Sequence, residues 1–212
     1  MNVVIRLEEE KDYDRVEEMT RAAFWNLYKP GCDEHYLAHI LRGHPDYLAD
    51  LGYVAEVEGE IAGLIMYTKS HVADEQGEIL DTVTFGPLCV APKFQRRGIG
   101  TKLIEFTRDL AVKKGFPAII ILGDPHNYCK HGFKTGKDFN VSMRDGRYPL
   151  GLLVLELKKG IFAGRKWRFK ESDAFELDPG KIEEYDKRFP AWEKGYAYSQ
   201  ELFSMLVRSV VE

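Results

Sequence analysis

Between an apolar strand and an amphipathic helix, this chain carries a short basic loop with two glycines. Residues 85–104 read FGPLCVAPKFQRRGIGTKLI, and residues 93–102 contain four cations and no acid. Such a junction directs free backbone N–H groups and the positive end of a helix dipole at one point, where a diphosphate fits. The formal net charge of the whole chain is -4, so this local reversal of sign indicates an anionic ligand.

The composition restricts the other classes of function. A chain of 212 residues with 44% hydrophobic and 30% charged residues is typical of a globular protein with one sizeable domain. Its net acidity argues against a nucleic-acid partner. Without a secretory signal or a run of about 18 apolar residues, we expect no membrane association. Cys32, Cys89 and Cys129 are odd in number and show no zinc spacing, so we expect free thiols, a cytoplasmic location and no metal.

Hydrophobic periodicity predicts alternating strands and helices over most of the chain. A strand at 3–7 precedes a helix near 12–28, which Pro30-Gly31 ends, and Asp33 is placed to cap a second short helix. Further strands are expected at 53–58, 61–70, 79–90, 118–122 and 152–157, with a long helix from Gly98 to Gly115 and a short helix after Asp124-Pro125.

Local signals refine this pattern into a fold. Glu58-Gly59-Glu60 is typical of a hairpin turn, and Gly86-Pro87 predicts a bulge within a strand. The continuous apolar run at 118–122 indicates a strand that is buried on both faces. The sequence therefore predicts an α/β fold (a mixed α+β sheet) with helices on both faces, as a domain at 1–160. Residues 161–212 have an aromatic-rich texture with little strand signal, and we expect a helical appendage that packs on this domain or on a partner subunit.

Two common phosphate-binding motifs fit the basic loop poorly. A Walker A loop needs lysine and then a hydroxyl residue, whereas Thr101 precedes Lys102 here. The dinucleotide fingerprint needs a third glycine where this chain has Leu103. A protein that binds ATP or GTP through this loop is therefore disfavoured.

A third pattern fits the loop closely. Residues 95–100, Gln-Arg-Arg-Gly-Ile-Gly, match Q/R-x-x-G-x-G/A, and residues 123–133 place a tyrosine a few positions before Gly-Phe. In this order of strand, loop, helix and buried strand, the sequence resembles the GNAT superfamily of N-acetyltransferases, in particular a bacterial branch with a Gly-Asp-Pro-x-x-Tyr segment. The resemblance covers roughly residues 1–160 and implies a GNAT-like acyl-CoA fold with acetyl-CoA as co-substrate.

The resemblance also assigns cofactor contacts. Main-chain groups of the strand before the loop would pair with the pantetheine amides, and backbone N–H groups of the loop would hold the pyrophosphate. Asn127 is expected to contact the cofactor from the short helix that follows. The implied cofactor-binding residues are Leu88, Cys89, Val90, Gln95, Arg96, Arg97, Gly98, Ile99, Gly100, Thr101, Lys102 and Asn127.

The catalytic roles follow from the chemistry of amine acetylation. The departing thiolate gains from a proton donor, and the resemblance implies Tyr128 for this role. Asp81, on the strand that leads to the bulge, is the candidate base, with His126 and His131 as alternatives. Cys89 has no histidine near it in sequence, which favours direct attack in a ternary complex over a covalent intermediate.

We therefore expect an N-acetyltransferase that acts on a primary amine of a small molecule or a protein. The alternative is a catalytically silent acyl-CoA sensor or interaction module on the same fold. The resemblance implies that the acceptor pocket is built from about 24–46 and 137–149. The apolar stripe on the last helix leaves a homodimer open as a further expectation.

Overall fold

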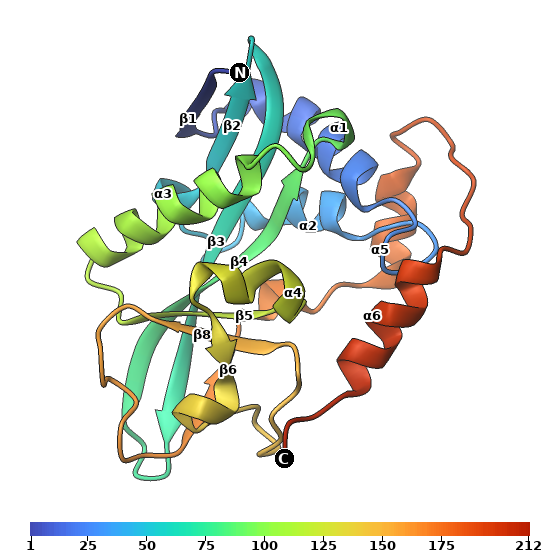
Figure 1. The fold of residues 1–212 in the computed structure, drawn as a ribbon. Helices are drawn as coiled ribbons and strands as arrows, with labels where there is room; N and C mark the ends of the chain where they lie inside the picture. Colours follow the sequence, from blue (N-terminus) through green and yellow to red (C-terminus); the bar gives the residue numbers. More distant parts are fainter.

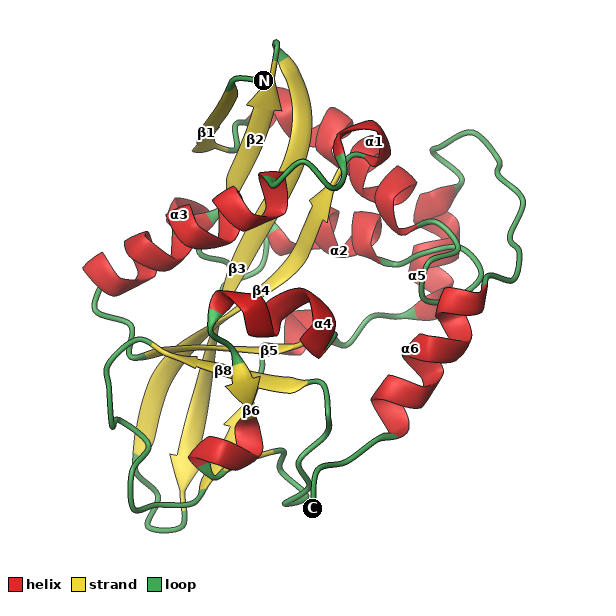
Figure 2. Cartoon of the chain, viewed as in Figure 1, coloured by secondary structure: helices red, strands yellow, loops and turns green.

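The computed structural model describes all 212 residues, and its nine strands form one mixed sheet with helices on both faces (Figures 1 and 2). The strands are β1 (Val3–Leu7), β2 (Tyr53–Val57), β3 (Glu60–Asp74), β4 (Ile79–Val90), β5 (Ala118–Leu122), β6 (Lys134–Thr135), β7 (Val141–Ser142), β8 (Leu152–Glu156) and β9 (Trp167–Lys170). The helices are α1 (Tyr13–Phe24), α2 (Glu34–Leu41), α3 (Ile99–Lys113), α4 (Pro125–Tyr128), α5 (Pro179–Asp186) and α6 (Tyr198–Arg208). The predicted mixed α/β class is confirmed.

The sheet follows the order β1-β2-β3-β4-β5-β8-β6, with β9 paired to β3 and to β7. Every pairing on this path is antiparallel except β4 with β5, which is parallel. The hairpin predicted at 58–60 joins β2 to β3, and Glu58 and Gly59 both adopt positive φ there. No helix of the structure is long and apolar enough to cross a membrane.

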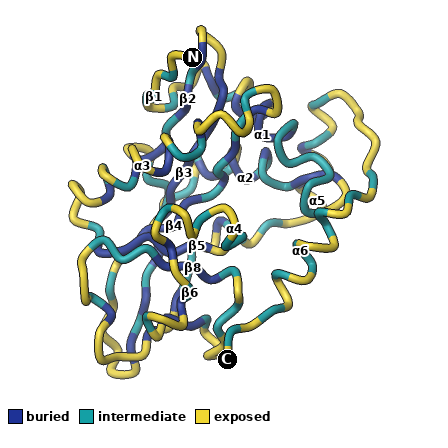
Figure 3. The backbone as a smooth tube through the Cα atoms, in the orientation of Figure 1, coloured by how far each residue is buried: buried dark blue, intermediate teal, exposed yellow.

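Alternation along β3 explains why helices cover both faces of the sheet. Leu64 and Met66 point toward α1 and α2, whereas Ile65 and Tyr67 point toward α3, and all four are fully buried. A third apolar cluster lies under the other half of the sheet, around Trp167 and neighbouring strands. Figure 3 shows these central strands as the most buried part of the chain.

A bulge interrupts β4 where Gly86-Pro87 predicts one. Ile65 of β3 pairs with Leu88 and Tyr67 pairs with Phe85, so two residues of β4 lie opposite one residue of β3. On its other edge, β4 pairs with β5 only at Val83↔Ile119. The two parallel strands therefore part before β4 reaches its end, and they run in different directions in Figure 2.

The first helix is shorter than its periodicity predicts. It ends at Phe24 because Trp25 is extended and Asn26 adopts a left-handed conformation with φ of 58°. The Asn26 side chain then accepts hydrogen bonds from the backbone N–H groups of Gly31 and Gly195, at 2.8 and 3.1 Å. The residues that extend the helical pattern beyond Phe24 form a loop that the distant C-terminal segment holds in place.

At the start of α2, the structure differs from the prediction in one detail. Asp33 occupies the N-cap position, but its side chain pairs with Lys29 and makes no capping hydrogen bond. Instead, the Glu34 carboxylate accepts a hydrogen bond from the backbone N–H of Asp33 at 3.0 Å. The capping role expected of Asp33 is therefore not observed.

The C-terminal segment supplies a strand that the sequence analysis does not predict. Trp167 and Phe169 are buried while Arg168 between them is exposed, so this short stretch has the alternation of a strand. It pairs antiparallel with the end of β3, which continues to Asp74, four residues beyond the predicted end at residue 70. The signal was present in the sequence, but it spans too few residues to stand out among the surrounding aromatics.

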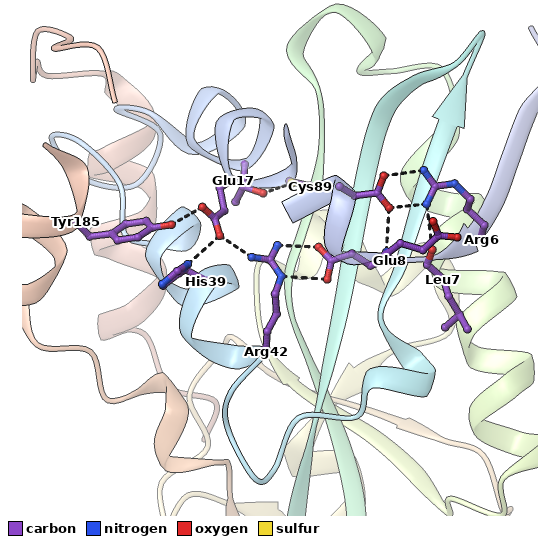
Figure 4. Close-up of polar contacts among 11 residues, drawn as sticks. Arg6, Leu7, Glu8, Glu17, His39, Arg42, Cys89 and Tyr185 are labelled. Carbon is purple, nitrogen blue, oxygen red and sulfur yellow. Dashed lines mark hydrogen bonds and ion pairs between the residues drawn. The ribbon is translucent and has the colours of Figure 1, made fainter. Parts of the chain in front are cut away.

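A buried polar network joins the C-terminal segment to α1 and α2 (Figure 4). Glu17 of α1 accepts hydrogen bonds from Tyr185 of α5 and Arg42 beyond α2, and it contacts His39 at 3.0 Å. Arg42 also binds Glu8 with two nitrogens, at 2.7 and 3.2 Å. The network places α5 against the first two helices of the chain.

Candidate active site

A cavity of about 230 Å³ lies between the end of α1, the bulged part of β4, the start of α3 and α4. It opens where β4 and β5 part, so the gap in the sheet is continuous with a hollow lined by side chains. Eight of the predicted site residues line it: Leu88, Cys89, Val90, Gln95, Gly100, Thr101, Asn127 and Tyr128.

The basic loop presents unpaired backbone N–H groups next to this cavity. The first amide of α3 that hydrogen-bonds within the chain is that of Lys102, which donates to the Gly98 carbonyl at 3.1 Å. None of the preceding amides from Arg96 to Thr101 donates to another group of the protein. Because the helix dipole adds positive potential at this end, the loop is built to bind an anion.

Backbone conformation explains the first glycine of the loop. Gly98 has a φ of 80°, a conformation that favours glycine, and a Cβ added to it would extend into open space. Arg96 also adopts positive φ, at 59°. Two left-handed residues so close together curl the loop and turn its N–H groups to one side.

The cations of the loop divide into two groups. Lys93 forms an ion pair with Glu60, the first residue of β3. Arg96, Arg97 and Lys102 are exposed and form no ion pair with the chain, so their charges are available to an anion. Together with the unpaired amides, they make this end of the cavity electropositive.

Five predicted contacts can act only through the main chain or at the rim of the cavity. The Ile99 side chain is 1% exposed and packs in the core with Leu103, so only its amide is available to a ligand. Arg96, Arg97, Gly98 and Lys102 flank the residues that line the cavity but do not line it themselves.

Successive side chains of a strand point to opposite faces, so the side chain of Cys89 lies on the other face of β4 from those of Leu88 and Val90. Its thiol lies 3.5 Å from the Thr20 hydroxyl, among the apolar residues that pack on α1 and α2. Burial raises the pKa of Cys89 to about 12, so the thiol stays protonated near neutral pH and is a poor nucleophile. Leu88 and Val90 point toward the other face, and the edge of β4 beside them has no partner strand.

Tyr128 closes the inner side of the cavity. Its ring packs against Phe85 and Phe133, with centroids 5.6 and 6.0 Å away. Gly123 makes room for it, because a Cβ at that position would lie 2.5 Å from the ring. Burial raises the pKa of Tyr128, so its hydroxyl is protonated at neutral pH, as a general acid must be before the reaction.

The short helix α4 positions both Asn127 and Tyr128. Its N-cap is Asp124, whose carboxylate accepts a hydrogen bond from the His126 backbone N–H at 2.9 Å. His131 also lines the cavity, whereas His126 does not. The Gly-Asp-Pro segment thus sets the start of the helix that carries the candidate proton donor.

The structure does not bring Asp81 into this cavity. Asp81 is exposed and lines a separate polar hollow of about 250 Å³, together with His71 and Lys170. Leu88 lies seven positions further along β4, which corresponds to about 23 Å along an extended strand. Asp81 as the base therefore stays a prediction without geometric support from this cavity.

Seven further residues line the cavity, from α1 and the loop after it, from α3 and from the turn after α4: Ala23, Phe24, Leu27, Tyr28, Ile104, Lys130 and His131. Of these, His131 was an alternative base, and Phe24, Leu27 and Tyr28 lie in the segment at 24–46 that was expected to form the acceptor pocket; Ala23, Ile104 and Lys130 were not predicted. In sequence, apolar residues at helical spacing are equally typical of a helix packed in the core. Phe24, the last residue of α1, and Tyr28, in the loop that follows it, both reach this cavity. The structure contains no group of three or more His, Cys, Asp or Glu side chains that could hold a metal ion.

Comparisons with known proteins agree with this architecture. The uncharacterized N-acetyltransferase YhbS of Escherichia coli (strain K12) is 32% identical over 112 residues, which cover 52% of this chain and 64% of that protein. The chain thus matches slightly less than two thirds of the length of this curated relative. The crystal structure of YhbS in complex with CoA superposes with a TM-score of 0.70 at 25% identity, covering 82% of this chain and 92% of that one.

A second structure shares the fold. A GNAT family acetyltransferase from Brucella melitensis, crystallised with acetyl-CoA, gives a TM-score of 0.62 at 24% identity, covering 82% of this chain and 98% of that chain. The family model described as Acetyltransferase (GNAT) family matches residues 14–133, from α1 to the end of the segment that carries Tyr128. This match spans more than half of the chain and includes the basic loop. The chain therefore belongs to the GNAT family of acetyltransferases.

Proposed function

We propose that this protein is an acetyl-CoA-dependent N-acetyltransferase that acetylates a primary amine by direct attack in a ternary complex. The observation that carries the proposal is the row of unpaired amides from Arg96 to Thr101, which lies where β4 and β5 part. The CoA complex of YhbS, a relative with the same fold, supports the choice of ligand.

Three groups of residues would bind three parts of the cofactor. The amides and free cations of the loop would hold the pyrophosphate, with charge-assisted contacts from Arg96, Arg97 or Lys102. The unpaired edge of β4 at Leu88 and Val90 would receive the pantetheine arm as an added strand. The thioester would then lie near the bulge, within the cavity that Tyr128 closes.

The reaction needs positioning and two proton transfers. A neutral amine attacks the thioester carbonyl carbon, and holding both reactants in one cavity supplies much of the acceleration. Tyr128 would donate a proton to the departing sulfur, consistent with its protonated hydroxyl. The thiol of Cys89 is buried and protonated, which supports direct attack rather than a covalent intermediate.

Calorimetry with acetyl-CoA, followed by measurement of CoA thiol release with a panel of primary amines, tests this function. Binding and amine-dependent release of CoA are the expected results. Failure of acetyl-CoA to bind would overturn the proposal. Binding without turnover across the panel would favour the acyl-CoA sensor, and thermal stabilisation by ATP or GTP instead would favour a nucleotide-binding protein.

Filling the cavity from the loop side should weaken cofactor binding. Gly100 lines the cavity, and a Cβ there meets only Val90 at 3.7 Å, so the Gly100→Leu side chain would occupy the space between α3 and β4. We expect the affinity for acetyl-CoA to fall at least about tenfold, because bulk at this point blocks the approach of the ligand. Val112→Leu, at an exposed position of the same helix, is the control and should bind as the parent protein does. Equal affinities in the two variants would contradict this assignment of the loop.

A further inference from the structure

The last helix, α6, carries an apolar stripe that the rest of the chain leaves uncovered. Tyr198, Leu202 and Met205 recur at i, i+4 and i+7 and therefore share one face of the helix, where they are 77, 58 and 58% exposed. No residue of α6 is buried, and Figure 3 shows this helix in the colours of half-buried and exposed residues. Contiguous apolar surface of this kind is typical of an interaction site.

The domain holds α6 by its opposite face. Ser199 Oγ donates a hydrogen bond to the Leu27 carbonyl at 2.7 Å, at the start of the helix. One turn later on the same face, Phe203 stacks on Tyr28 with ring centroids 4.4 Å apart. The apolar stripe therefore lies on the far side of the helix from the domain, and Figure 1 shows α6 at the outer edge of the molecule.

The chain that follows α6 fixes the other end of the helix. The backbone N–H of Leu150 donates to the Ser209 carbonyl at 2.9 Å, and that of Val211 donates to the Tyr148 carbonyl at 2.8 Å. Leu150 and Val210 are exposed, so apolar surface continues next to this end of α6. Because the helix is held at both ends, a partner that binds the stripe does not have to order it first.

Two unpaired charges of opposite sign flank the stripe along one edge. Glu201 and Arg208 are seven residues apart, which places them on the same side of the helix at a separation of two turns, or about 10 Å. Both are exposed, and neither forms an ion pair within the chain. When two copies pack this stripe antiparallel about a two-fold axis, Glu201 of each copy comes opposite Arg208 of the other. The face of α6 is therefore complementary to itself.

The same charges argue against a lipid surface as the partner. A helix that lies on a membrane carries several lysines or arginines on its polar face, whereas α6 has one arginine and one glutamate. A surface that supplies its own complement under a half-turn rotation favours a second copy of the same chain. Apolar periodicity alone leaves a homodimer open, whereas the held inner face and the charged edge specify which side of the helix pairs and in which orientation.

We propose that α6 forms the interface of a homodimer, in which the stripes of Tyr198, Leu202 and Met205 pack antiparallel and Glu201 of each copy pairs with Arg208 of the other. The inference goes beyond the proposed acetyl transfer and does not depend on it. Two helices of 11 residues bury less than the about 1,600 Å² of a standard interface. We therefore expect a dimer that dissociates in the micromolar range.

Sedimentation equilibrium of the intact protein, over about 1–200 µM, tests this assembly. The expected result is a mass that rises with concentration toward that of two chains. Leu202→Glu should weaken the association at least about tenfold, because it places two carboxylates at the centre of the apolar contact. Ile79→Glu is the matched control, since it makes the same change at a 63% exposed position of β4, and it should dimerise as the parent does. A parent protein that is monomeric over the whole range would overturn the inference.

Charge reversal tests the identity of the partner and the orientation of the pair. Glu201→Arg and Arg208→Glu should each weaken the dimer at least about fivefold at low salt, because the two-fold axis turns two attractive contacts into two repulsive ones. The protein with both reversals should associate within about twofold of the parent. An equimolar mixture of the two single variants should do so as well, since opposite charges again face each other across the axis.

Other occupants of the stripe give different results. A dimer formed through another surface would be insensitive to Leu202→Glu and to charge reversal, and a monomer that binds anionic vesicles would indicate a lipid partner; either result contradicts the proposal. Thermal unfolding at about 1 µM, where the parent is expected to be monomeric, is the control for folding. The unfolding midpoints should agree among the variants, because all the substituted side chains are exposed.

Discussion

Replacing Tyr128 by phenylalanine should lower kcat for acetyl transfer by at least about 100-fold, because general acid catalysis by a positioned side chain contributes about 10²–10⁴ in rate. The substitution removes only the hydroxyl, and the ring keeps its packing against Phe85 and Phe133. Acetyl-CoA affinity and thermal stability should therefore stay close to those of the parent. Steady-state kinetics with saturating acetyl-CoA and amine provide the measurement.

Tyr53→Phe is the matched control for this experiment. Tyr53 lies on β2 and packs against Phe106 of α3, with ring centroids 5.0 Å apart. It does not line the cavity that Tyr128 closes. Its hydroxyl has no role in the proposed chemistry, so the rate should change by less than about twofold. A Tyr128→Phe variant that keeps the parental rate would show that another group, or water, protonates the departing sulfur.

Replacing Arg42 by alanine should lower the free energy of unfolding by about 3–5 kcal/mol, because it leaves two buried carboxylates without their cation. Glu8 and Glu17 are each only 3% exposed, and both bind the Arg42 guanidinium. The guanidinium also lies 3.9 Å from the centroid of the Tyr13 ring, and this contact would be lost as well. Chemical denaturation at neutral pH measures the difference.

An exposed ion pair provides the comparison for Arg42→Ala. Arg15 and Glu18 form a pair on α1 in which both side chains are more than half exposed. Arg15→Ala should cost less than about 1 kcal/mol, since water screens such pairs. Similar losses in the two variants would mean that the network around Glu17 contributes no more than a surface pair, and that other contacts hold the C-terminal segment to α1.

Much of the cofactor side of the site was predictable because its signals are local. The glycine at residue 98, the bulge at Gly86-Pro87 and the start of α3 each follow from the conformational preferences of a few neighbouring residues. Their order along the chain then places a loop of free amides beside a parted sheet. The tyrosine of α4 is likewise set by the Asp-Pro start of its short helix.

Two of the differences in detail arise where a local pattern had more than one structural outcome. Helical periodicity continues through Leu27, but α1 ends at Phe24 because Asn26 binds both Gly31 and the distant Gly195. The alternating stretch Trp167–Lys170 is too short to indicate a strand until β3 offers an edge for it. In both places a contact far along the chain decides between conformations that the local sequence leaves nearly equal.

The amino-acid sequence by itself determined the fold class and the anion-binding loop, since backbone geometry and amphipathic pattern act over only a few residues. Tertiary structure alone decided which side chains meet in the cavity between the end of α1, the start of α2 and the C-terminal helix. Glu34 lies at the start of the second helix and Phe203 in the last one, and no periodicity or spacing relates them. They meet because the buried network around Glu17 and Arg42 and the Asn26 loop bring the C-terminal segment back to α1.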